Sequence, residues 1–322
     1  AADRSPFHTI FMKTKLNEFL KSEVRVLKRF LKSIGIYGSQ ISISGFSGYV
    51  TEVLVLNYGS FKNVLQAFAN LTPNYVVSLT PPDKQAVEKF ASPIVIIDPI
   101  DSNRNLGAAI SKECLSKFVL ASRLFLKTPS KQFFMKPHRS NEKKISYISS
   151  NLLIIDFKIQ KRSPDILWGQ LNKRLTSISR QLSITGFEII KKFCFTDEGE
   201  RAVLIFMIKF PILSKINLNS GPKIFLKSET DSFIKKRIKN SIMIWTDDMR
   251  VVSIEQRKMT SIKQYARQII QNDIDSGSQN GISLDLKNGY SIYMANEKKL
   301  SSFIYSAIDQ MVSNGEFISQ RK

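Results

Sequence analysis

Hydrophobic residues recur every three or four positions between residues 23 and 34, which predicts an amphipathic helix. Ser22 is placed to cap this helix and Gly35 to end it. The opposite face is basic, and its side chains repel one another unless an anion meets them. Exposed basic faces are also common in proteins that bind no anion there, so the stripe alone does not show that this face has an anionic partner. The apolar positions are Val24, Leu27, Phe30, Leu31 and Ile34, and the basic positions are Arg25, Lys28, Arg29 and Lys32.

Two further helical patterns cover residues 61–71 and 106–126. They are separated by a proline-rich stretch near residues 80–84 and by the apolar run 94–97. This part of the chain is therefore expected to form one mostly helical domain.

A domain boundary is expected in residues 136–144. This segment is polar and basic, contains Pro137 and lacks apolar periodicity. It divides the chain into a helical domain over residues 1–136 and a second region over residues 137–322.

The second region opens with a strand pattern over residues 148–159. A helix is then expected, because Ser163 is placed as its N-cap and Pro164 lies in its first turn. Two β-rich runs follow, over residues 187–195 and 202–210. This order predicts an open α+β sandwich. The expected helix has an apolar stripe made of Leu167, Leu171, Leu175, Ile178 and Leu182.

Residues 231–272 combine apolar periodicity with many basic side chains, which predicts basic helices. A strand over residues 289–294 and a helix over residues 298–312 close the chain. The predicted fold class is α+β, a helical domain followed by an open sheet with basic helices. The basic cluster consists of Lys235, Lys236, Arg237 and Lys239.

Charge narrows the choice of partners. The chain has 48 Lys and Arg against 27 Asp and Glu, a formal net charge of +21, and 43% of its residues are hydrophobic. It should fold, and nucleic acid is the leading partner for such a charge. An anionic membrane is the competing partner, but we find no apolar run of transmembrane length. We expect a cytoplasmic protein.

Residues for metal or nucleophile chemistry are scarce. Cys114, Cys194, His8 and His138 are the only cysteines and histidines. They predict reduced thiols and no structural metal. None lies in a hydrolase signature, and the glycines lack the spacing of a Walker or dinucleotide-binding loop.

Nucleotidyl transfer requires carboxylates that hold magnesium, usually an acidic pair behind a Gly-Ser turn. Gly59 and Ser60 are followed by a helix pattern without acids. Asp273 and Asp275 lie in what reads as a polar loop without such a turn. The adjacent pair at 247–248, in an expected helical stretch, has the wrong spacing and reads as a solvated turn or cap. We therefore expect neither catalytic residues nor metal ligands here.

Four motifs follow one another along the first part of the chain. They are DRSPFH at residues 3–8, EVRVLKRFLKSIGIYG at 23–38, GFSGYVTEVLVLNYGSF at 45–61 and IDPIDSNRNLGAAIS at 97–111. This series resembles the archaeal, class I CCA-adding tRNA nucleotidyltransferases, and the similarity continues to residue 134. The C-terminal region fits this family in size and pattern but offers no equally specific motif.

The resemblance implies an enzyme of head, neck, body and tail domains that adds C, C and A to the tRNA 3′ end without a template. It implies CTP and ATP as substrates and Mg²⁺ held by the head. DRSPFH lies just after the head in the family, and this chain begins there without an initiator methionine. We expect the neck in residues 1–136, the body and tail in residues 137–322, and no polymerisation by this chain alone. Removal of the head and a separately encoded head polypeptide both stay open.

By the resemblance, His8, Lys28 and Tyr37 match positions that contact the incoming nucleotide, mainly its triphosphate. Arg104 resembles an arginine that reads the base edge together with RNA phosphate. Without the resemblance, His8 reads as a satisfied histidine, Lys28 as solvated and Tyr37 as a helix-end residue. Arg104 would then brace its loop by pairing with a nearby aspartate, Asp98 or Asp101.

The family grips the acceptor and T arms of tRNA with its body and tail, by shape and backbone contacts. The basic helices expected after residue 231 are the candidates for this grip. Two other functions stay open. One is a non-catalytic RNA-binding module, and the other is the neck of a related poly(A) polymerase or oligoadenylate synthetase, which the IDPID and RN motifs disfavour.

Overall fold

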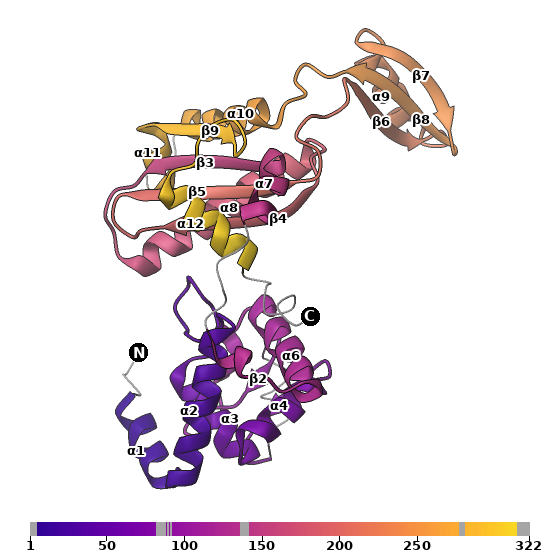
Figure 1. The fold of residues 1–322 in the computed structure, drawn as a ribbon. Helices are drawn as coiled ribbons and strands as arrows, with labels where there is room; N and C mark the ends of the chain where they lie inside the picture. The colour runs from indigo at the N-terminus through magenta and orange to yellow at the C-terminus, as the bar shows by residue number, and fades with distance from the viewer. Residues whose placement is uncertain are drawn as a thin grey trace. The chain divides into compact units, whose positions relative to one another are not determined.

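Two units make up the fold, which a computed structural model describes for residues 5–81, 88, 90, 92–135, 142–276 and 281–313 (Figure 1). Unit 1 comprises residues 1–141 together with 309–322, and unit 2 comprises residues 142–308. The fold is α+β, with helices in unit 1 and antiparallel sheets in unit 2, as the sequence predicted. His138 and most of the expected boundary segment lie outside the described residues.

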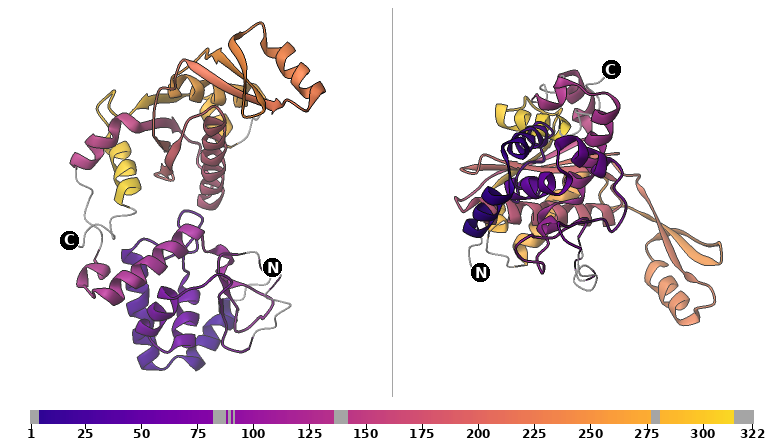
Figure 2. Two further views of the ribbon diagram at one scale, coloured as in Figure 1. Left: turned by 90° about the vertical axis from the view of Figure 1, so that its right-hand side faces the viewer. Right: turned by 90° about the horizontal axis from the view of Figure 1, so that it is seen from below.

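Unit 1 consists of short helices packed around α2, as the views in Figures 1 and 2 show. Its small parallel sheet pairs β1 with β2. The described elements are α1 (Ser5–Lys15), α2 (Glu18–Ser33), α3 (Gly48–Tyr58), α4 (Phe61–Ala69), β1 (Val76–Val77), β2 (Val95–Ile96), η1 (Leu106–Ala109), α6 (Lys112–Lys127) and η2 (Lys131–Phe134).

Helix α2 buries the predicted apolar stripe, and Phe30 lies at the centre of a cluster of phenylalanine rings from α4, α6 and η2. Gly35 follows the helix with a φ of 73°, as predicted for its end. The predicted cap was wrong. The helix begins at Glu18, because the Asn17 side chain accepts a hydrogen bond from Leu20 N, and Ser22 lies inside the helix.

The Gly59-Ser60 pair separates α3 from α4. Gly59 ends α3 with a φ of 79°, and the Ser60 hydroxyl accepts a hydrogen bond from Asn63 N at the start of α4. Helix α4 confirms the helical pattern predicted from residue 61. The helix predicted over residues 106–126 is instead divided into η1 and α6, because Ser111 is extended and caps α6 through Cys114 N.

Unit 2 contains a four-stranded antiparallel sheet in the order β4-β5-β3-β9. Helices α8, α10 and α11 pack on one of its faces, and the buried stripe of α8 is the one predicted. The predicted strands and the closing helix are confirmed. The elements are α7 (Glu142–Ile148), η3 (Ser149–Asn151), β3 (Leu152–Lys158), α8 (Pro164–Ile184), β4 (Ile189–Thr196), β5 (Arg201–Ile208), α10 (Ile262–Asp275), α11 (Ile282–Lys287), β9 (Tyr290–Met294) and α12 (Ser302–Ser313), of which residues 309–313 are assigned to unit 1.

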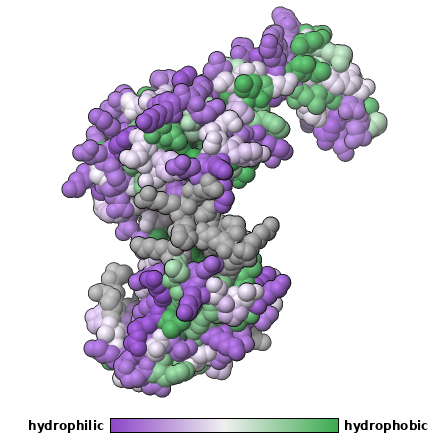
Figure 3. Space-filling view, in the orientation of Figure 1, coloured by the Kyte–Doolittle hydropathy of each residue, from purple (hydrophilic) through white to green (hydrophobic). Residues whose placement is uncertain are grey.

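A second antiparallel sheet has the order β6-β8-β7 and packs against α9 (Lys227–Arg237). Its strands are β6 (Ile216–Lys223), β7 (Ser241–Asp247) and β8 (Arg250–Gln256). Several of its apolar side chains are exposed, and Figure 3 shows hydrophobic surface over this part of the chain. The exposed apolar side chains on β6 and β7 are Ile216, Leu218, Ile242 and Met243.

This sheet corrects the prediction of continuous basic helices over residues 231–272. Asp248 and Met249 have φ values of 41° and 60°, so they form a tight two-residue turn of the kind that joins hairpin strands. Pairing of β7 with β8 then outweighs the local helical pattern. The turn predicted for Asp247-Asp248 is confirmed, but its helical surroundings were wrong.

Asp273 and Asp275 were placed in a loop, and this was also wrong, because both lie in the last turn of α10. Asp273 forms an ion pair with Arg174 at 2.6 Å and accepts a hydrogen bond from Ser283. Asp275 accepts a hydrogen bond from Gln271. In the part of the chain that the structure describes, no helix is long and apolar enough to cross a membrane.

Candidate functional site

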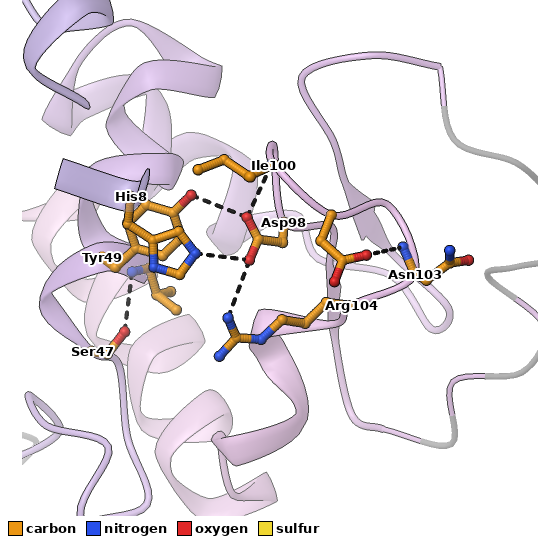
Figure 4. A network of polar contacts seen from close by, with 9 residues as sticks. His8, Ser47, Tyr49, Asp98, Ile100, Asn103 and Arg104 are labelled. Carbon is orange, nitrogen blue, oxygen red and sulfur yellow. Dashed lines mark hydrogen bonds and ion pairs between the residues drawn. The ribbon is translucent and has the colours of Figure 1, made fainter. Parts of the chain in front are cut away.

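His8 and Arg104 meet at a single buried carboxylate, that of Asp98 (Figure 4). His8 Nε2 lies 3.1 Å from Asp98 Oδ2, and Arg104 Nη1 lies 3.3 Å from the same oxygen. The His8 ring also stacks on Tyr49, with ring centroids 3.8 Å apart and planes inclined by 16°. Helix α1, helix α3 and the loop after β2 therefore come together here.

The Asp98 side chain is fully buried, whereas that of Arg104 is 42% exposed. The other carboxylate oxygen of Asp98, Oδ1, accepts hydrogen bonds from the Tyr49 hydroxyl and from Ile100 N, each at 3.1 Å. A carboxylate has about four acceptor positions, and all of them are used by these donors. The charge of a buried carboxylate is tolerated only when it is paired and hydrogen-bonded in this way.

Arg104 lies at the end of a loop that Asp98 begins. Asp98 N donates to Arg104 O, Asp101 N donates to Asp98 O, and Arg104 N donates to Asp101 O. The Arg104–Asp98 ion pair is the contact that a bracing role requires. Only Nη1 of Arg104 bonds to Asp98, and the side chain is partly exposed. The guanidinium therefore has further N–H donors that are not bonded to any of the described residues.

Lys28 and Tyr37 lie on a second side of the α3 N-terminus. Lys28 Nζ lies 2.8 Å from Glu52 Oε1, and both side chains are about one quarter exposed. An ideal Cβ built on Gly48 lies 3.2 Å from Tyr37 Oη and 3.8 Å from Lys28 Nζ. The tyrosine hydroxyl and the lysine ammonium are therefore neighbours, and glycine at position 48 leaves them room.

All four sequence-predicted residues thus contact, directly or through Asp98, the first turns of α3. His8 stacks on Tyr49, Arg104 reaches Tyr49 through Asp98, and Lys28 and Tyr37 adjoin Gly48. The Ser47 hydroxyl accepts a hydrogen bond from Val50 N and so fixes where this helix begins.

Two other basic residues of the α2 stripe have partners within unit 1. Arg29 Nε donates to Phe134 O at 2.8 Å, and Lys32 Nζ lies 5.0 Å from the centre of the Tyr37 ring. Much of the basic stripe is therefore engaged by the protein itself. Lys28 differs, since its ammonium has three donors and the hydrogen bond to Glu52 uses one.

The pKa values of Tyr49 and Cys114 in unit 1 are raised above their ordinary values. Burial, together with the Asp98 charge and the hydrogen bond to it, raises the pKa of Tyr49 far above its usual range, so its hydroxyl stays a donor at neutral pH. Burial also raises the pKa of the Cys114 thiol. In unit 2, burial raises the pKa of Cys194 to about 12. Both cysteines are free thiols.

Sequence reasoning did not identify Tyr49, Glu52 or the central role of Asp98. Tyr49 and Glu52 lie in the GFSGYVTE motif, and Asp98 begins the DPID segment directly after the apolar run. An acidic residue placed just after a buried strand is a usable signal, because its charge must find partners.

A cavity of about 560 Å³ borders the same loop, and Asp98 is among the residues that line it. The other walls come from α1, α3 and residues 78–80, with Phe11, Leu56 and Ile100 among its apolar residues and Lys15 as its basic residue. Packing against this cavity therefore does little to hold the loop in place.

Two protein families match parts of the chain. The description "tRNA nucleotidyltransferase, second domain" matches residues 22–135, which include α2, α3 and the Asp98 loop. The description "CCA-adding enzyme, C-terminal domain" matches residues 149–295, which include both antiparallel sheets.

Curated relatives agree with these matches. The CCA-adding enzyme of Saccharolobus shibatae is 37% identical over 273 residues, which cover 84% of this chain and 63% of the relative. The enzymes of Sulfurisphaera tokodaii and Pyrobaculum neutrophilum are each 36% identical over 264 residues, 81% of this chain. The matches span between 60% and 63% of the length of these relatives. The chain therefore belongs to the archaeal CCA-adding enzyme family, of which it carries the second and C-terminal domains.

Proposed function

We propose that this chain supplies nucleotide selection and tRNA binding for addition of CCA to the tRNA 3′ end. The observation that carries the proposal is the convergence of His8, Lys28, Tyr37 and Arg104 on the first turns of α3. In this division, residues 1–136 are the neck, which contacts nucleotide and RNA. Residues 137–322 are the body and tail, which bind tRNA.

The triphosphate of CTP or ATP is held by the Lys28 side of the site. The Lys28 ammonium is a point charge for a phosphate oxygen, and the Tyr37 hydroxyl beside it donates a hydrogen bond. Glu52 keeps the lysine in position and forms an ion pair with it when nucleotide is absent. Its negative charge also weakens the attraction for phosphate, so Lys28 binds by contact rather than by strong long-range attraction.

His8 presents its second ring nitrogen, Nδ1, to the ligand. When Nε2–H donates to Asp98, the neutral ring leaves Nδ1 as an acceptor for a hydroxyl. The protonated ring instead has a donor at Nδ1, which suits a phosphate oxygen.

Arg104 reads the base. Asp98 holds Nη1, and the remaining donors of its planar fork face a base edge or an RNA phosphate. A fork of fixed geometry can distinguish the hydrogen-bonding edge of cytosine from that of adenine, which a lysine cannot do.

Among the described residues, no group of three or more His, Cys, Asp or Glu side chains could hold a magnesium ion. The sequence likewise has no acidic pair behind a Gly-Ser turn. We assign the metal-binding carboxylates of the reaction to a head domain, with the 322-residue chain inactive in polymerisation by itself.

For tRNA, the exposed lysines at the end of α9 are the leading phosphate contacts. Lys235, Lys236 and Lys239 are exposed, whereas Arg237 is engaged by Glu255 and by the Phe233 ring. Each phosphate neutralised in a duplex arm makes the slope of log K against log salt more negative by about 0.9. Affinity for the acceptor and T arms should therefore fall steeply with salt.

The test of nucleotide selection is Arg104→Ala in the enzyme that also carries the metal-binding domain. We expect the ratio of CTP to ATP incorporation to change at each of the three added positions, with tRNA affinity little affected. Lys21→Ala, in an exposed ion pair of the same unit, is the matched control. A selection ratio equal to that of the unsubstituted enzyme would contradict the role of Arg104.

A second experiment separates the proposal from a non-catalytic RNA-binding module. Lys235→Gln combined with Lys236→Gln should lower tRNA affinity. It should also make the slope of log K against log salt less negative by about 1.8. Binding that is indifferent to salt would contradict the tRNA role. Tight binding without any nucleotide affinity in this chain would favour the RNA-binding module.

A further inference from the structure

Asp98 is the common point of the network around His8 and Arg104, and it lies too deep to touch a ligand itself. Its side chain is fully buried, while the groups around it reach the surface to different extents. The His8 side chain is 14% exposed and that of Arg104 is 42% exposed. His8 and Arg104 therefore provide exposed surface that is bonded directly to the buried carboxylate.

The partners of Asp98 come from three separate parts of the chain. His8 belongs to α1, Tyr49 to α3, and Arg104 to the loop that Asp98 begins. Each oxygen joins two of these donors, with His8 and Arg104 on Oδ2 and Tyr49 and Ile100 N on Oδ1. The side chains of His8 and Arg104 are thereby fixed to one atom.

Packing alone does not fix them. The loop borders a cavity of about 560 Å³, and Ile100 is exposed. Stacking on Tyr49 fixes the plane of the His8 ring but leaves the ring free to rotate within that plane. The hydrogen bond to Asp98 fixes this rotation. The same bond selects which ring nitrogen faces away from the carboxylate.

We infer that Asp98 is a positioning residue for nucleotide selection, which couples His8 and Arg104 so that triphosphate and base are recognised in one fixed geometry, with Tyr49 as its second anchor. The inference rests on the proposed nucleotide-binding function of His8 and Arg104. It adds a requirement that the two residues act together rather than independently.

Asp98→Asn is the decisive variant, because the amide has the same shape but only one oxygen. It leaves either the His8 and Arg104 pair or the Tyr49 and Ile100 pair facing an NH₂ group. We expect the affinity of the 322-residue chain for ATP and for CTP to fall roughly tenfold, the effect of one lost charge-assisted hydrogen bond. Glu113→Gln, in an ion pair with Lys117 in the same unit, is the matched control.

Proton NMR of the histidine rings reports positioning without any ligand. The chain has two histidines, His8 and His138, so the spectrum is simple, and His8→Gln assigns the resonances. Stacking on Tyr49 at 3.8 Å should move the ring protons of His8 away from their free positions. We expect Asp98→Asn to shift these resonances toward the free positions and Glu113→Gln to leave them unchanged.

The two measurements separate the inference from the function on which it rests. If His8→Ala weakens nucleotide binding but Asp98→Asn changes neither affinity nor the His8 resonances, the positioning role is overturned and the proposed function stands. If the unsubstituted chain binds neither ATP nor CTP, the proposed function is overturned, and the resonances still decide whether Asp98 orients His8.

A folding control keeps the test decisive. Circular dichroism shows whether Asp98→Asn is folded, and if it is not, Tyr49→Phe replaces it. This change removes one donor from Asp98 Oδ1 and keeps the stacked ring. We expect a roughly fivefold loss of affinity, as for one neutral hydrogen bond, and a shift of the His8 resonances. Unchanged affinity and resonances would overturn the inference.

Discussion

Each unit contains a buried carboxylate paired with arginine, but the two units use it differently. In unit 2, the Arg162 side chain is 14% exposed and that of its partner Asp285 is 1% exposed, while Arg174 pairs with the partly exposed Asp273. In unit 1, Asp98 is as deeply buried, yet its partner Arg104 is 42% exposed. The same ion pair therefore fixes structure in one unit, whereas in the other it holds groups that remain accessible to a ligand.

The environment of the cation explains the difference. Arg162 bonds both to Asp285 and to Gln170, and Asp285 also accepts a hydrogen bond from Gln160 N, so this pair joins the end of β3 to α8 and α11. Arg104 stands at the end of a loop beside a cavity. Breaking a pair in unit 2 should mainly reduce stability, and changes around the α3 site of unit 1 should mainly reduce nucleotide binding.

The largest expected effect is that of Asp285→Ala. It leaves the mostly buried Arg162 guanidinium without its carboxylate, which should lower the free energy of unfolding by about 3 kcal/mol. Chemical denaturation measures this loss, and ATP and CTP affinity should not change. Glu188→Ala, in an exposed pair with Lys209, is the control and should cost less than about 0.5 kcal/mol. Equal losses for the two variants would refute the contrast.

Lys28→Ala should show the opposite pattern. The Lys28–Glu52 pair is partly exposed, so its loss should change the free energy of unfolding by less than about 1 kcal/mol. Affinity for CTP and ATP should fall roughly tenfold, because a charged contact to phosphate is lost. Isothermal titration of the chain with each nucleotide measures this. An affinity that stays constant would mean that Lys28 is a surface lysine.

Gly48→Ala sharpens the separation of stability from binding. Alanine favours helix over glycine, so the variant should be as stable as the original or more stable by about 0.5 kcal/mol. Its Cβ would lie 3.2 Å from Tyr37 Oη, so the hydroxyl must shift and nucleotide affinity should fall severalfold. Denaturation and titration together test this. A drop in stability without loss of affinity would argue against a site at Gly48.

The smallest effects concern the two thiols, one in each unit, which report on the opening of each unit separately. Burial raises the pKa of Cys194 to about 12 and raises that of Cys114, so labelling with a thiol reagent at pH 8 should be slow in the native chain. Asp285→Ala should speed labelling of Cys194 but not of Cys114. Mass spectrometry of the labelled peptides distinguishes them.

The contribution of the Cys194 thiol to the free energy of unfolding changes with pH in a definite direction. Above the ordinary thiol pKa of 9.0, the unfolded chain loses the Cys194 proton while the folded chain keeps it. The stability contributed by this thiol is therefore complete below pH 9 and is lost as pH rises toward 12. Cys194→Ala should flatten this part of the stability profile. A profile that is identical with and without the thiol would contradict the displaced pKa.

The sequence predicted those elements whose apolar residues form one stripe or alternate. Helix α8 has such a stripe and the burial of β4 alternates, and both were found, as was β5, which is a continuous apolar run. Helix α3 was not predicted, because Val50, Val53, Leu54 and Val55 are all buried and leave no polar face to reveal the period. Strands β7 and β8 were mistaken for helix because their pairing depends on a turn, not on local preference.

The site could be predicted only in part for a similar reason. Family resemblance selected four residues from motifs, yet it could not show which of them share a partner. The contacts of Asp98 with His8 and Tyr49 span 90 and 49 positions of the chain, and the Lys28–Glu52 contact spans 24. Such contacts arise from tertiary packing, so a single sequence reveals the chemistry of the site but not its connections.

Nucleotide addition to a tRNA that lacks its terminal CCA tests the central claim most directly. The assay compares the protein isolated from its native source with the 322-residue chain, and uses labelled CTP and ATP. We predict that the native protein adds C, C and A, and that the chain alone binds this tRNA in a salt-dependent way but adds nothing. A native protein that binds tRNA tightly without adding nucleotides would contradict the account and identify an RNA-binding module.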